Sequence, residues 1–518
     1  MAKGRTENSI RNSSVAIIGQ VISVVSSFVV RTVFIKYLGN SYLGINGLFS
    51  NILSLLSFAE LGFGTAIVYA MYKPIAENDE KRISAFMNFY AKIYRGIGSF
   101  ILVGGVMLIP FLDFFIGDSS QIPEGLPPIS IIYVLYLLNS AFSYFFNYKR
   151  SIITASQNGY LDSINQLGFT LLRNVFQLGV LVVFRSFVLY LLVQIGCTFL
   201  GNFSISLKAD KLYPYLKKKK NEKLDGDTIK GIMKNVLAMA CHKLGSVIVS
   251  GTDNILITKY VGLVATGQYS NYVLLTSTVR TLYLQLLNPI TASIGNLIAT
   301  ESVNVSYRMF KRILFANSYI AIFCSVCLLS LANPFIELFW GQDSVFSFPL
   351  VALIVVIFFV NCIRKTAEMY IDTTGLFWQI KWKSIIEGII NLVASIVLAG
   401  PMKLGITGIV LGTLISNVAT NLWWEPYVVY HYYFKKPLYL YFVEYTKYIL
   451  TFIAATIITL YIESGFANDI FSFILKCVIS VAVPNILLFM FFIKSDEMQY
   501  FVRVLKSLVE KKWGKRRA

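Results

Sequence analysis

The sequence predicts an all-α integral membrane protein with about 14 transmembrane helices. Of its 518 residues 56% are hydrophobic and only 14% are charged, and apolar runs recur along almost the whole chain. Roughly 20 apolar residues span a bilayer as a helix, and most of the runs reach that length. The pattern also repeats: a Lys-Tyr-Leu-Gly motif ending at Gly39 returns as Lys-Tyr-Val-Gly ending at Gly262, and Gly267 repeats Gly44 at the same offset. Two related halves are therefore expected.

The expected spans follow the apolar runs in order. Six fall in each half, and two more follow at the C-terminus. Their ranges are 13–37, 43–71, 89–116, 128–150, 160–184, 187–207, 231–259, 265–299, 310–332, 348–375, 381–400, 405–430, 446–462 and 470–493.

The domain organisation follows from the repeat and from the polar interruptions. We expect an N-terminal six-helix lobe (1–207), a basic cytoplasmic linker (208–230), a C-terminal six-helix lobe (231–430), two additional transmembrane helices (431–494) and a basic amphipathic cytoplasmic tail (495–518). A second repeated pattern supports the two pseudo-symmetric lobes. Lys149-Arg150 precedes Gly159 at the same spacing at which Lys365-Thr366 precedes Gly375. Transporters built from two such halves bind substrate between them.

The charge distribution predicts the topology. The net charge is +19, which in a polytopic membrane protein reflects Lys and Arg in cytoplasmic loops rather than nucleic-acid binding. With the N-terminus inside, the expected inner loops are rich in Lys and Arg and the outer loops are poor in them. Both termini are therefore expected in the cytoplasm. The first residues lack the cleavage site of a signal peptide, so the first span is expected to remain in the mature protein.

No enzyme or metal site is expected. The only two histidines, His242 and His431, fall in different lobes, and no nucleotide-binding or hydrolase motif occurs. Cys324 and Cys327 have a CxxC spacing, but they lie in an apolar run without a second pair. Metal and cofactor sites are accordingly absent from the predicted function.

Ionisable residues within the spans are the candidates for function. An ionisable group in the bilayer tends to face a partner or a wet cavity. The basic ones proposed to bind substrate are Arg31, Arg173, Lys243, Arg280, Arg364 and Lys365. Structural pairing is the alternative, with Arg31–Glu60 and Lys365–Glu368 as the candidate pairs. The cations outnumber plausible partners, which predicts a positively charged cavity and an anionic substrate such as a diphosphate or an acidic sugar.

The motifs resemble one bacterial transporter family. They are Asn-Ser-Ile-Arg-Asn at 8–12, the segment from Arg31 to Gly44, Phe-Ala-Glu-Leu-Gly-Phe-Gly at 58–64 and Gly-Thr-Asp-Asn at 251–254. They are similar to those of the bacterial polysaccharide transporters, the O-antigen and capsular repeat-unit flippases of the multidrug/oligosaccharidyl-lipid/polysaccharide exporter superfamily. The resemblance implies a multi-pass protein of the bacterial cytoplasmic (inner) membrane with two facing six-helix bundles and two extra helices.

The resemblance also implies an activity. Undecaprenyl-diphosphate-linked oligosaccharide, a repeat unit of O-antigen, capsule or exopolysaccharide, would pass from the inner to the outer leaflet by alternating access. The six central cations would receive its head group, and Glu60 or Asp253 would carry a coupling H⁺ or Na⁺. Membrane lipids and other polysaccharide-assembly membrane proteins are the expected partners.

Three other functions compete with this one. An ion-coupled multidrug exporter of the same superfamily would share the lobes, but a site for organic cations should be acidic and aromatic. A membrane glycosyltransferase or ligase would need a catalytic site outside the bilayer, and no long external loop is expected. A pure scaffold would leave the intramembrane charges without a purpose.

Overall fold

The structure is a computed structural model that describes residues 2–60, 63–117, 121–156, 158–218, 222–467, 469–503 and 506. Side chains are described for fewer residues, since those of 2–18 and 237–250 and a few scattered positions are left out. The described part is helical and contains no β-strand. Contacts divide it into unit 1, up to Ser270, and unit 2, from Asn271.

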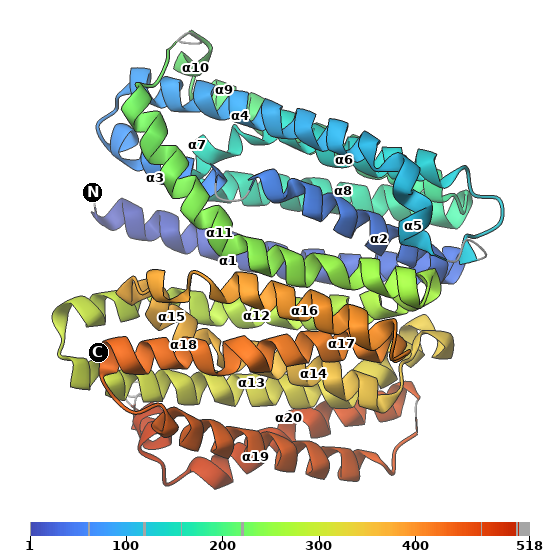
Figure 1. The fold of residues 1–518 in the computed structure, drawn as a ribbon, viewed down its shortest axis with the longest axis vertical. Helices are drawn as coiled ribbons and strands as arrows, with labels where there is room; N and C mark the ends of the chain where they lie inside the picture. The colour runs from blue at the N-terminus through green and yellow to red at the C-terminus, as the bar shows by residue number, and fades with distance from the viewer. Residues whose placement is uncertain are drawn as a thin grey trace, which may run out of the picture. The chain divides into compact units, whose positions relative to one another are not determined.

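Unit 1 is a bundle of long helices with short helices between some of them (Figure 1). Its elements are α1 (Ala2–Leu38), α2 (Asn40–Leu56), α3 (Phe63–Ala76), α4 (Glu80–Met107), α5 (Leu112–Ile116), α6 (Ile129–Asn147), α7 (Arg150–Ala155), α8 (Gly159–Val183), α9 (Phe187–Leu212), α10 (Tyr215–Lys218), α11 (Gly226–Tyr260) and the start of α12 (Leu263–Thr300). Helix α8 packs between α1 and α9, and α6 packs between α4 and α9.

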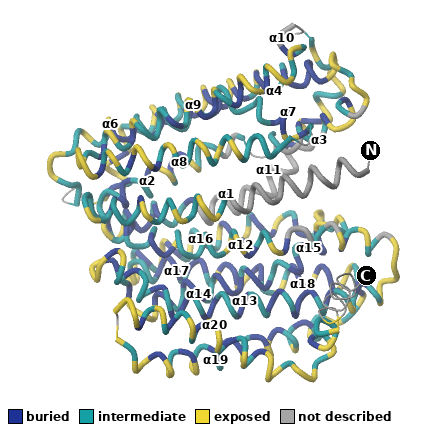
Figure 2. The backbone as a smooth tube through the Cα atoms, turned by 180° about the vertical axis from the view of Figure 1, so that it is seen from behind, coloured by how far each residue is buried: buried dark blue, intermediate teal, exposed yellow. Residues whose placement is uncertain are grey.

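Unit 2 is built around α13. Its elements after α12 are α13 (Val303–Trp340), α14 (Phe348–Ile363), α15 (Lys365–Thr374), α16 (Lys383–Ala399), α17 (Gly405–Ser416), α18 (Leu422–Val428), α19 (Tyr439–Glu463) and α20 (Ile470–Phe492). Helix α13 contacts α14, α19 and α20, and α16 packs along α17. Much of α13 and α14 is buried, whereas α8 in unit 1 has few buried positions (Figure 2).

The expected multi-pass membrane character is supported by the helices themselves. Ten of the described helical stretches are long and apolar enough to cross a membrane, and α4 with the bent segment after it makes an eleventh. Large apolar side chains such as Val175 and Phe176 are exposed on their outer faces, as expected of residues that contact lipid. The protein is an all-α multi-pass membrane protein. The count of 14 spans and the cytoplasmic placement of both termini remain predictions.

Several spans expected to be continuous are broken. The 43–71 span divides into α2, a 3₁₀ turn at Ser57–Glu60 and α3. The 348–375 span breaks at Arg364 between α14 and α15, and the 405–430 span contains π-helical turns at Asn417–Asn421 and Val429–Phe434. Such breaks lie beside polar or charged side chains that find partners on other helices, and apolar length alone does not reveal them.

The repeated glycines make a reciprocal contact at two helix starts. Gly39 and Gly262 precede α2 and α12 with φ values of 87° and 118°, which favour glycine. A Cβ at Gly44 would overlap the carbonyl oxygen of Leu263, and a Cβ at Gly267 would overlap that of Asn40. All these residues belong to unit 1. The repeat in the sequence therefore marks a close backbone approach between the starts of α2 and α12.

The expected domain boundaries rest on the repeat, and the contacts group the helices differently. Helix α11, with which the second repeat begins, packs on α2, α3 and α5 and belongs to unit 1. The repeat boundaries stay a prediction about how the sequence is organised. In the tail, the described residues after Ser495 are helical, and Phe501 lies near Phe315 of α13.

Candidate functional site: a cationic cavity in unit 1

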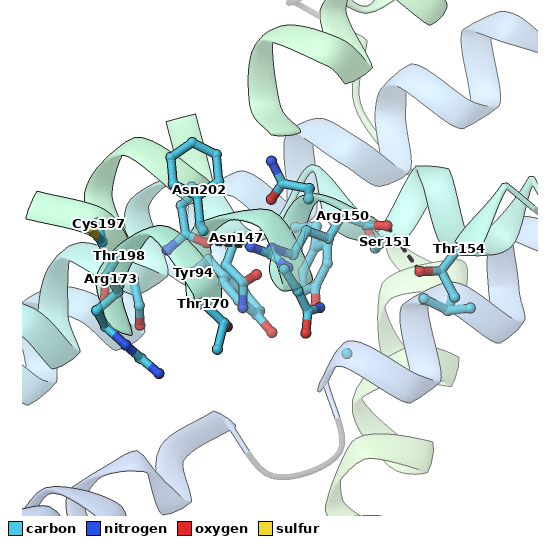
Figure 3. A pocket seen from close by; sticks show the side chains of 18 residues that line it. Tyr94, Asn147, Arg150, Ser151, Thr154, Thr170, Arg173, Cys197, Thr198 and Asn202 are labelled. Carbon is cyan, nitrogen blue, oxygen red and sulfur yellow. Dashed lines mark hydrogen bonds between the residues drawn. The ribbon is translucent and has the colours of Figure 1, made fainter. Parts of the chain in front are cut away.

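A cavity of about 550 Å³ opens between the helices of unit 1. Helices α3, α4, α6, α7, α8 and α9 all contribute to its lining (Figure 3). Two of the described lining residues are charged, Arg150 and Arg173, and both are basic. Most of the other lining side chains are hydroxyls or amides. The cavity is therefore polar and positively charged although it lies among membrane helices.

Arg150 is largely neutralised by its neighbours. It begins the short helix α7, where the chain turns after α6. Its Nη1 lies 2.6 Å from Oδ1 of Asp162 and its Nη2 donates to Oδ1 of Asn202 at 2.8 Å. Its buried Nε has no hydrogen-bond partner within the described residues. One donor of the guanidinium group is thus buried without a partner among these residues.

Arg173 carries a charge that unit 1 does not balance within its described residues. It lies near the middle of α8 and is partly buried. Within the described residues, the guanidinium group of Arg173 makes neither a hydrogen bond nor an ion pair. A cation held in a bundle of apolar helices without a carboxylate favours binding of an anion.

A second polar cavity adjoins the cationic one. It has a volume of about 370 Å³ and shares the lining residues Ser143 and Thr198 with it. Its other polar lining residues are Ser50, Ser54, Ser57, Tyr136, Asn139, Ser140 and Gln194. None of the described residues that line it is charged. The pair of cavities thus places hydroxyl and amide groups beside a guanidinium group.

These uncharged polar residues are not among the predicted site residues, although the sequence contains a signal for them. Ser50, Ser54 and Ser57 follow helical spacing and lie on one face of the chain at α2. A polar stripe within an apolar run indicates a wet surface. Arg150 was used only as a marker of the repeat, and its partner Asp162 lies on α8.

Arg31 and Glu60 contact different partners. Nη2 of Arg31 donates to Oγ of Ser270 at 2.7 Å. Glu60 accepts a hydrogen bond from the hydroxyl of Tyr94, which lines the cationic cavity. The ion pairs of the described residues do not include Arg31–Glu60. Glu60 is therefore linked to the cavity through Tyr94, while Arg31 connects α1 to α12.

Asp253, the other residue considered for ion coupling, lies on α11. Its Oδ2 accepts a hydrogen bond from the hydroxyl of Tyr269 at 3.3 Å. Its Oδ1 is buried and has no hydrogen-bond partner within the described residues. A buried carboxylate oxygen without a donor is costly, which makes this atom a place where a proton or cation would be stabilised.

In unit 2 two of the predicted cations, Arg364 and Lys365, lie in a network of ion pairs. Nε and Nη2 of Arg364 donate to the two carboxylate oxygens of Glu425 at 3.0 and 2.6 Å. Nη2 of Arg364 also lies 2.8 Å from Oε1 of Glu368. Lys365 lies 3.2 Å from Oε2 of Glu368, so the predicted Lys365–Glu368 pair is present.

Two further residues complete this network. Nζ of Lys383 lies 2.6 Å from Oε1 of Glu425 and 3.5 Å from Oε2 of Glu387. Lys383 and Glu425 are almost fully buried, with exposed side-chain fractions of 4% and 2%. The unit 2 network, defined as Arg364, Lys365, Glu368, Lys383, Glu387 and Glu425, contains as many cations as carboxylates. Lys383 and Glu425 were not among the residues proposed from the sequence.

Of the two remaining predicted cations, only Arg280 has a described side chain. Arg280 is exposed on α12. The side chain of Lys243 lies outside the described residues. Arg173 lies in unit 1, whereas Arg364 and Lys365 lie in unit 2. Among the described residues no group of three or more His, Cys, Asp or Glu side chains is arranged to hold a metal ion.

Comparisons with known proteins identify the fold. No protein-family model matches the sequence, and no curated protein matches it. A structure of the lipid II flippase MurJ in an inward-closed conformation superposes with a TM-score of 0.65 at 16% identity, over 92% of this chain and 98% of that one.

Two multidrug transporters have the same architecture. An inward-facing transporter of the MATE family, within the MOP superfamily, gives a TM-score of 0.63 at 13% identity, over 80% of this chain and 98% of that one. A point mutant of VcmN, a MATE transporter of Vibrio cholerae, gives 0.55 at 13% identity, over 85% and 100% of the two chains. The chain therefore has the fold shared by MurJ and the MATE transporters.

Proposed function

We propose that the protein is a flippase that moves undecaprenyl-diphosphate-linked oligosaccharides from the inner to the outer leaflet of the bacterial cytoplasmic membrane by alternating access. The observation that carries the proposal is the cationic cavity of unit 1, in which Arg173 has no carboxylate partner within the described residues. The oligosaccharides would be repeat units of O-antigen, capsule or exopolysaccharide.

The chemistry of the two cavities fits the head group of such a lipid. A diphosphate presents several anionic oxygens, and the guanidinium fork of Arg173 binds such oxygens through charge-assisted hydrogen bonds. Sugar hydroxyls both donate and accept hydrogen bonds, and Ser54, Asn139 and Gln194 of the adjoining cavity offer both kinds of partner. The polyprenyl tail would stay in the bilayer.

The fold supports a flippase by analogy. MurJ is named as a flippase of lipid II, and its likeness to this chain covers nearly the full length of both proteins. At 16% identity the likeness concerns the fold, and one fold can carry several functions. The choice of substrate therefore rests on the side chains of the cavities.

Energy coupling would use an acidic residue. Glu60 is connected to the cationic cavity through the hydroxyl of Tyr94, and Asp253 has a buried oxygen without a donor within the described residues. Carboxylates within spans serve proton and ion relays in transporters. Binding of H⁺ or Na⁺ at one of them would accompany reorientation. Other membrane proteins of polysaccharide assembly would supply the substrate and take it up.

A multidrug exporter is the second candidate, because two MATE transporters share the fold. An organic cation would be repelled by the charge of Arg173, whereas the charge of Arg150 is balanced by Asp162. The electrostatics of this cavity favour the anionic substrate.

The experiment that tests the proposal uses a strain from which the protein is deleted. We expect lipid-linked repeat units to accumulate on the inner leaflet and surface polysaccharide to be lost, as measured by lipid extraction and polysaccharide assay. Normal polysaccharide together with new sensitivity to cationic dyes would instead favour the multidrug exporter.

Variants of Arg173 then connect the phenotype to the cavity. Arg173→Ala removes the unbalanced charge, and the loss of charge-assisted hydrogen bonds should weaken binding of purified undecaprenyl diphosphate by about 10- to 100-fold. Arg173→Lys should retain part of it. The matched control is Arg82→Ala, which changes an exposed arginine in the first turn of α4. Full complementation by Arg173→Ala at normal protein levels would remove Arg173 from the mechanism.

A further inference from the structure

A third cavity of unit 1 has the lining of an anion site. It has a volume of about 520 Å³ and lies where the start of α4 meets the ends of α6 and α9 and the short helix α10. Its polar lining residues are Asn88, Lys92, Arg95, Tyr148, Lys149 and Asp210. Three cations and one carboxylate of the described chain thus face the same space, which we name the α4–α10 pocket.

The carboxylate is already used by one of the cations. Nζ of Lys149 lies 2.7 Å from Oδ1 of Asp210, and both side chains are mostly buried. Lys92 and Arg95 lie one turn apart on α4 and have neither a hydrogen bond nor an ion pair within the described residues. Two positive charges in the α4–α10 pocket therefore have no counter-charge among the described residues.

Other polar groups line the pocket beside these two charges. The side-chain amide of Asn88 donates to the backbone carbonyl of Glu222 at 3.1 Å, which attaches the segment after α10 to α4. Arg95 and Asp210 both lie close enough to the Tyr148 hydroxyl to interact with it electrostatically. The pocket thus has a hydrogen-bonded amide and a phenol in its wall beside the two cations.

The α4–α10 pocket is separate from the cationic cavity. None of its described lining residues lines the cationic cavity. Helix α4 contributes Tyr90 and Tyr94 to the cationic cavity and Lys92 and Arg95 to the pocket, so two different faces of the helix are used. In the same way, Lys149 lines the α4–α10 pocket, whereas Arg150, the next residue in the chain, lines the cationic cavity. A ligand of the pocket therefore does not compete for the residues proposed to carry substrate.

We propose that the α4–α10 pocket binds a phosphate-bearing anion, either the headgroup of an anionic lipid or a soluble phosphate compound. An arginine fork and a lysine ammonium are the usual partners of phosphate oxygens. The loop charges predict that these helix ends face the cytoplasm, where basic pockets between membrane helices bind anionic headgroups. Binding would tie α4 to α9 and to the segment that precedes α11.

The experiment is a thermal-unfolding titration of the full-length protein. One arm adds phosphatidylglycerol to protein in nanodiscs of phosphatidylcholine, and a second arm adds inorganic phosphate to protein in neutral detergent at constant ionic strength. A ligand that binds only the folded protein raises the unfolding midpoint. We expect a saturable rise in at least one arm. A rise with lipid alone assigns the headgroup, and a rise with inorganic phosphate assigns a soluble anion.

Three variants locate the effect. The double variant Lys92→Gln, Arg95→Gln should weaken the apparent affinity for the added lipid or phosphate by about tenfold or more, because charge-assisted hydrogen bonds are lost. Lys81→Gln, Arg82→Gln removes two exposed charges from the first turn of the same helix and should leave the affinity unchanged. Arg173→Ala should also leave it unchanged. No rise in either arm, equal weakening in the first two variants, or loss only in Arg173→Ala would each overturn the proposal.

Discussion

Two membrane-embedded cations, Arg173 of unit 1 and Arg364 of unit 2, have opposite surroundings. In unit 1 Arg173 faces a cavity and has no counter-charge within the described residues. In unit 2 Arg364 and Lys383 share Glu425, and the unit 2 network contains equal numbers of cations and carboxylates. The first arrangement leaves a charge for a ligand, and the second uses its charges to hold α15, α16 and α18 together.

The comparison separates residues that look alike in the sequence. Arg173 and Arg364 both lie in apolar runs, and both were proposed to bind substrate. Their surroundings predict different consequences of substitution. Loss of Arg173 should impair binding with little effect on folding, whereas loss of a member of the unit 2 network should impair folding first.

The largest expected effect is that of Glu425→Gln. It leaves Arg364 and Lys383 buried without their shared carboxylate, and breaking a buried ion pair typically costs about 3–5 kcal/mol. Denaturant titration in detergent measures the free energy of unfolding. The control is Glu77→Gln, since the Lys73–Glu77 pair is exposed and should contribute at most about 1 kcal/mol. Similar small losses in both variants would contradict the structural role of the network.

A second substitution tests whether charge balance is the cause. Lys383→Met in the Glu425→Gln background removes one cation, so two cations and two carboxylates remain. We expect the double variant to recover about 0.5–3 kcal/mol relative to the sum of the single variants. The same titrations complete the double-mutant cycle. Additive losses would mean that Lys383 and Glu425 contribute independently.

Unit 1 should be sensitive at its glycine contact rather than at its cavity. Gly44→Ala places a Cβ against the carbonyl oxygen of Leu263, and overpacking of this kind costs about 1–3 kcal/mol. Gly96→Ala is the matched control on α4, because a Cβ there meets nothing within 4 Å. It should be neutral or slightly stabilising. If the two variants unfold alike, the close approach is not a source of stability.

Arg173→Gln is expected to change stability little. The variant removes a charge that forms no ion pair within the described residues, and such changes usually remain within about 0.5 kcal/mol. Arg364→Gln, measured in parallel, should be strongly destabilised because Glu425 and Glu368 lose a partner. A large loss in Arg173→Gln would reveal a structural partner for Arg173 and would erase the contrast between the units.

The smallest effects on stability are expected from the aspartates that cap helices, and they should be similar in the two units. Asp225 caps α11 and Asp469 caps α20, and hydrogen bonds to Thr228 and Ser472 hold the pKa of each carboxyl below its usual value. A lowered pKa contributes stability above the unfolded pKa of about 3.9 that is lost as the pH falls through the folded pKa. The difference in unfolding midpoint between wild type and Asp469→Asn should therefore shrink from pH 7 to about pH 3. A difference that stays constant would exclude this linkage.

The fold class was predictable because bilayer thickness converts apolar run length directly into helices. The breaks were not, because they depend on partners elsewhere in the chain. Lys365–Glu368 was predictable because the two residues lie three apart on one helix. Glu425 reaches Arg364 across 61 residues of sequence, and no local spacing indicates that contact.

The candidate site was predicted in part. Arg173 was identified because a cation in the middle of an apolar run is unusual. The residues beside it are serines, threonines, asparagines and glutamines, which occur in ones and twos along several different helices. Their common position becomes visible only when the helices pack together. Arg150 was visible in the sequence, but only the contact with Asp162 shows that its charge is balanced.

The reciprocal contact of Gly44 and Gly267 has the form of an isologous interface. In a symmetric homodimer residue i of one subunit contacts residue j of the other, and j contacts i in return. Here the same reciprocity joins Gly44 to Leu263 and Gly267 to Asn40 within one polypeptide. In a homodimer every mutation is present in both subunits and therefore changes both copies of such a contact. This chain carries the two copies in separate codons, so each half of the contact can be altered, and its contribution measured, while the other stays intact.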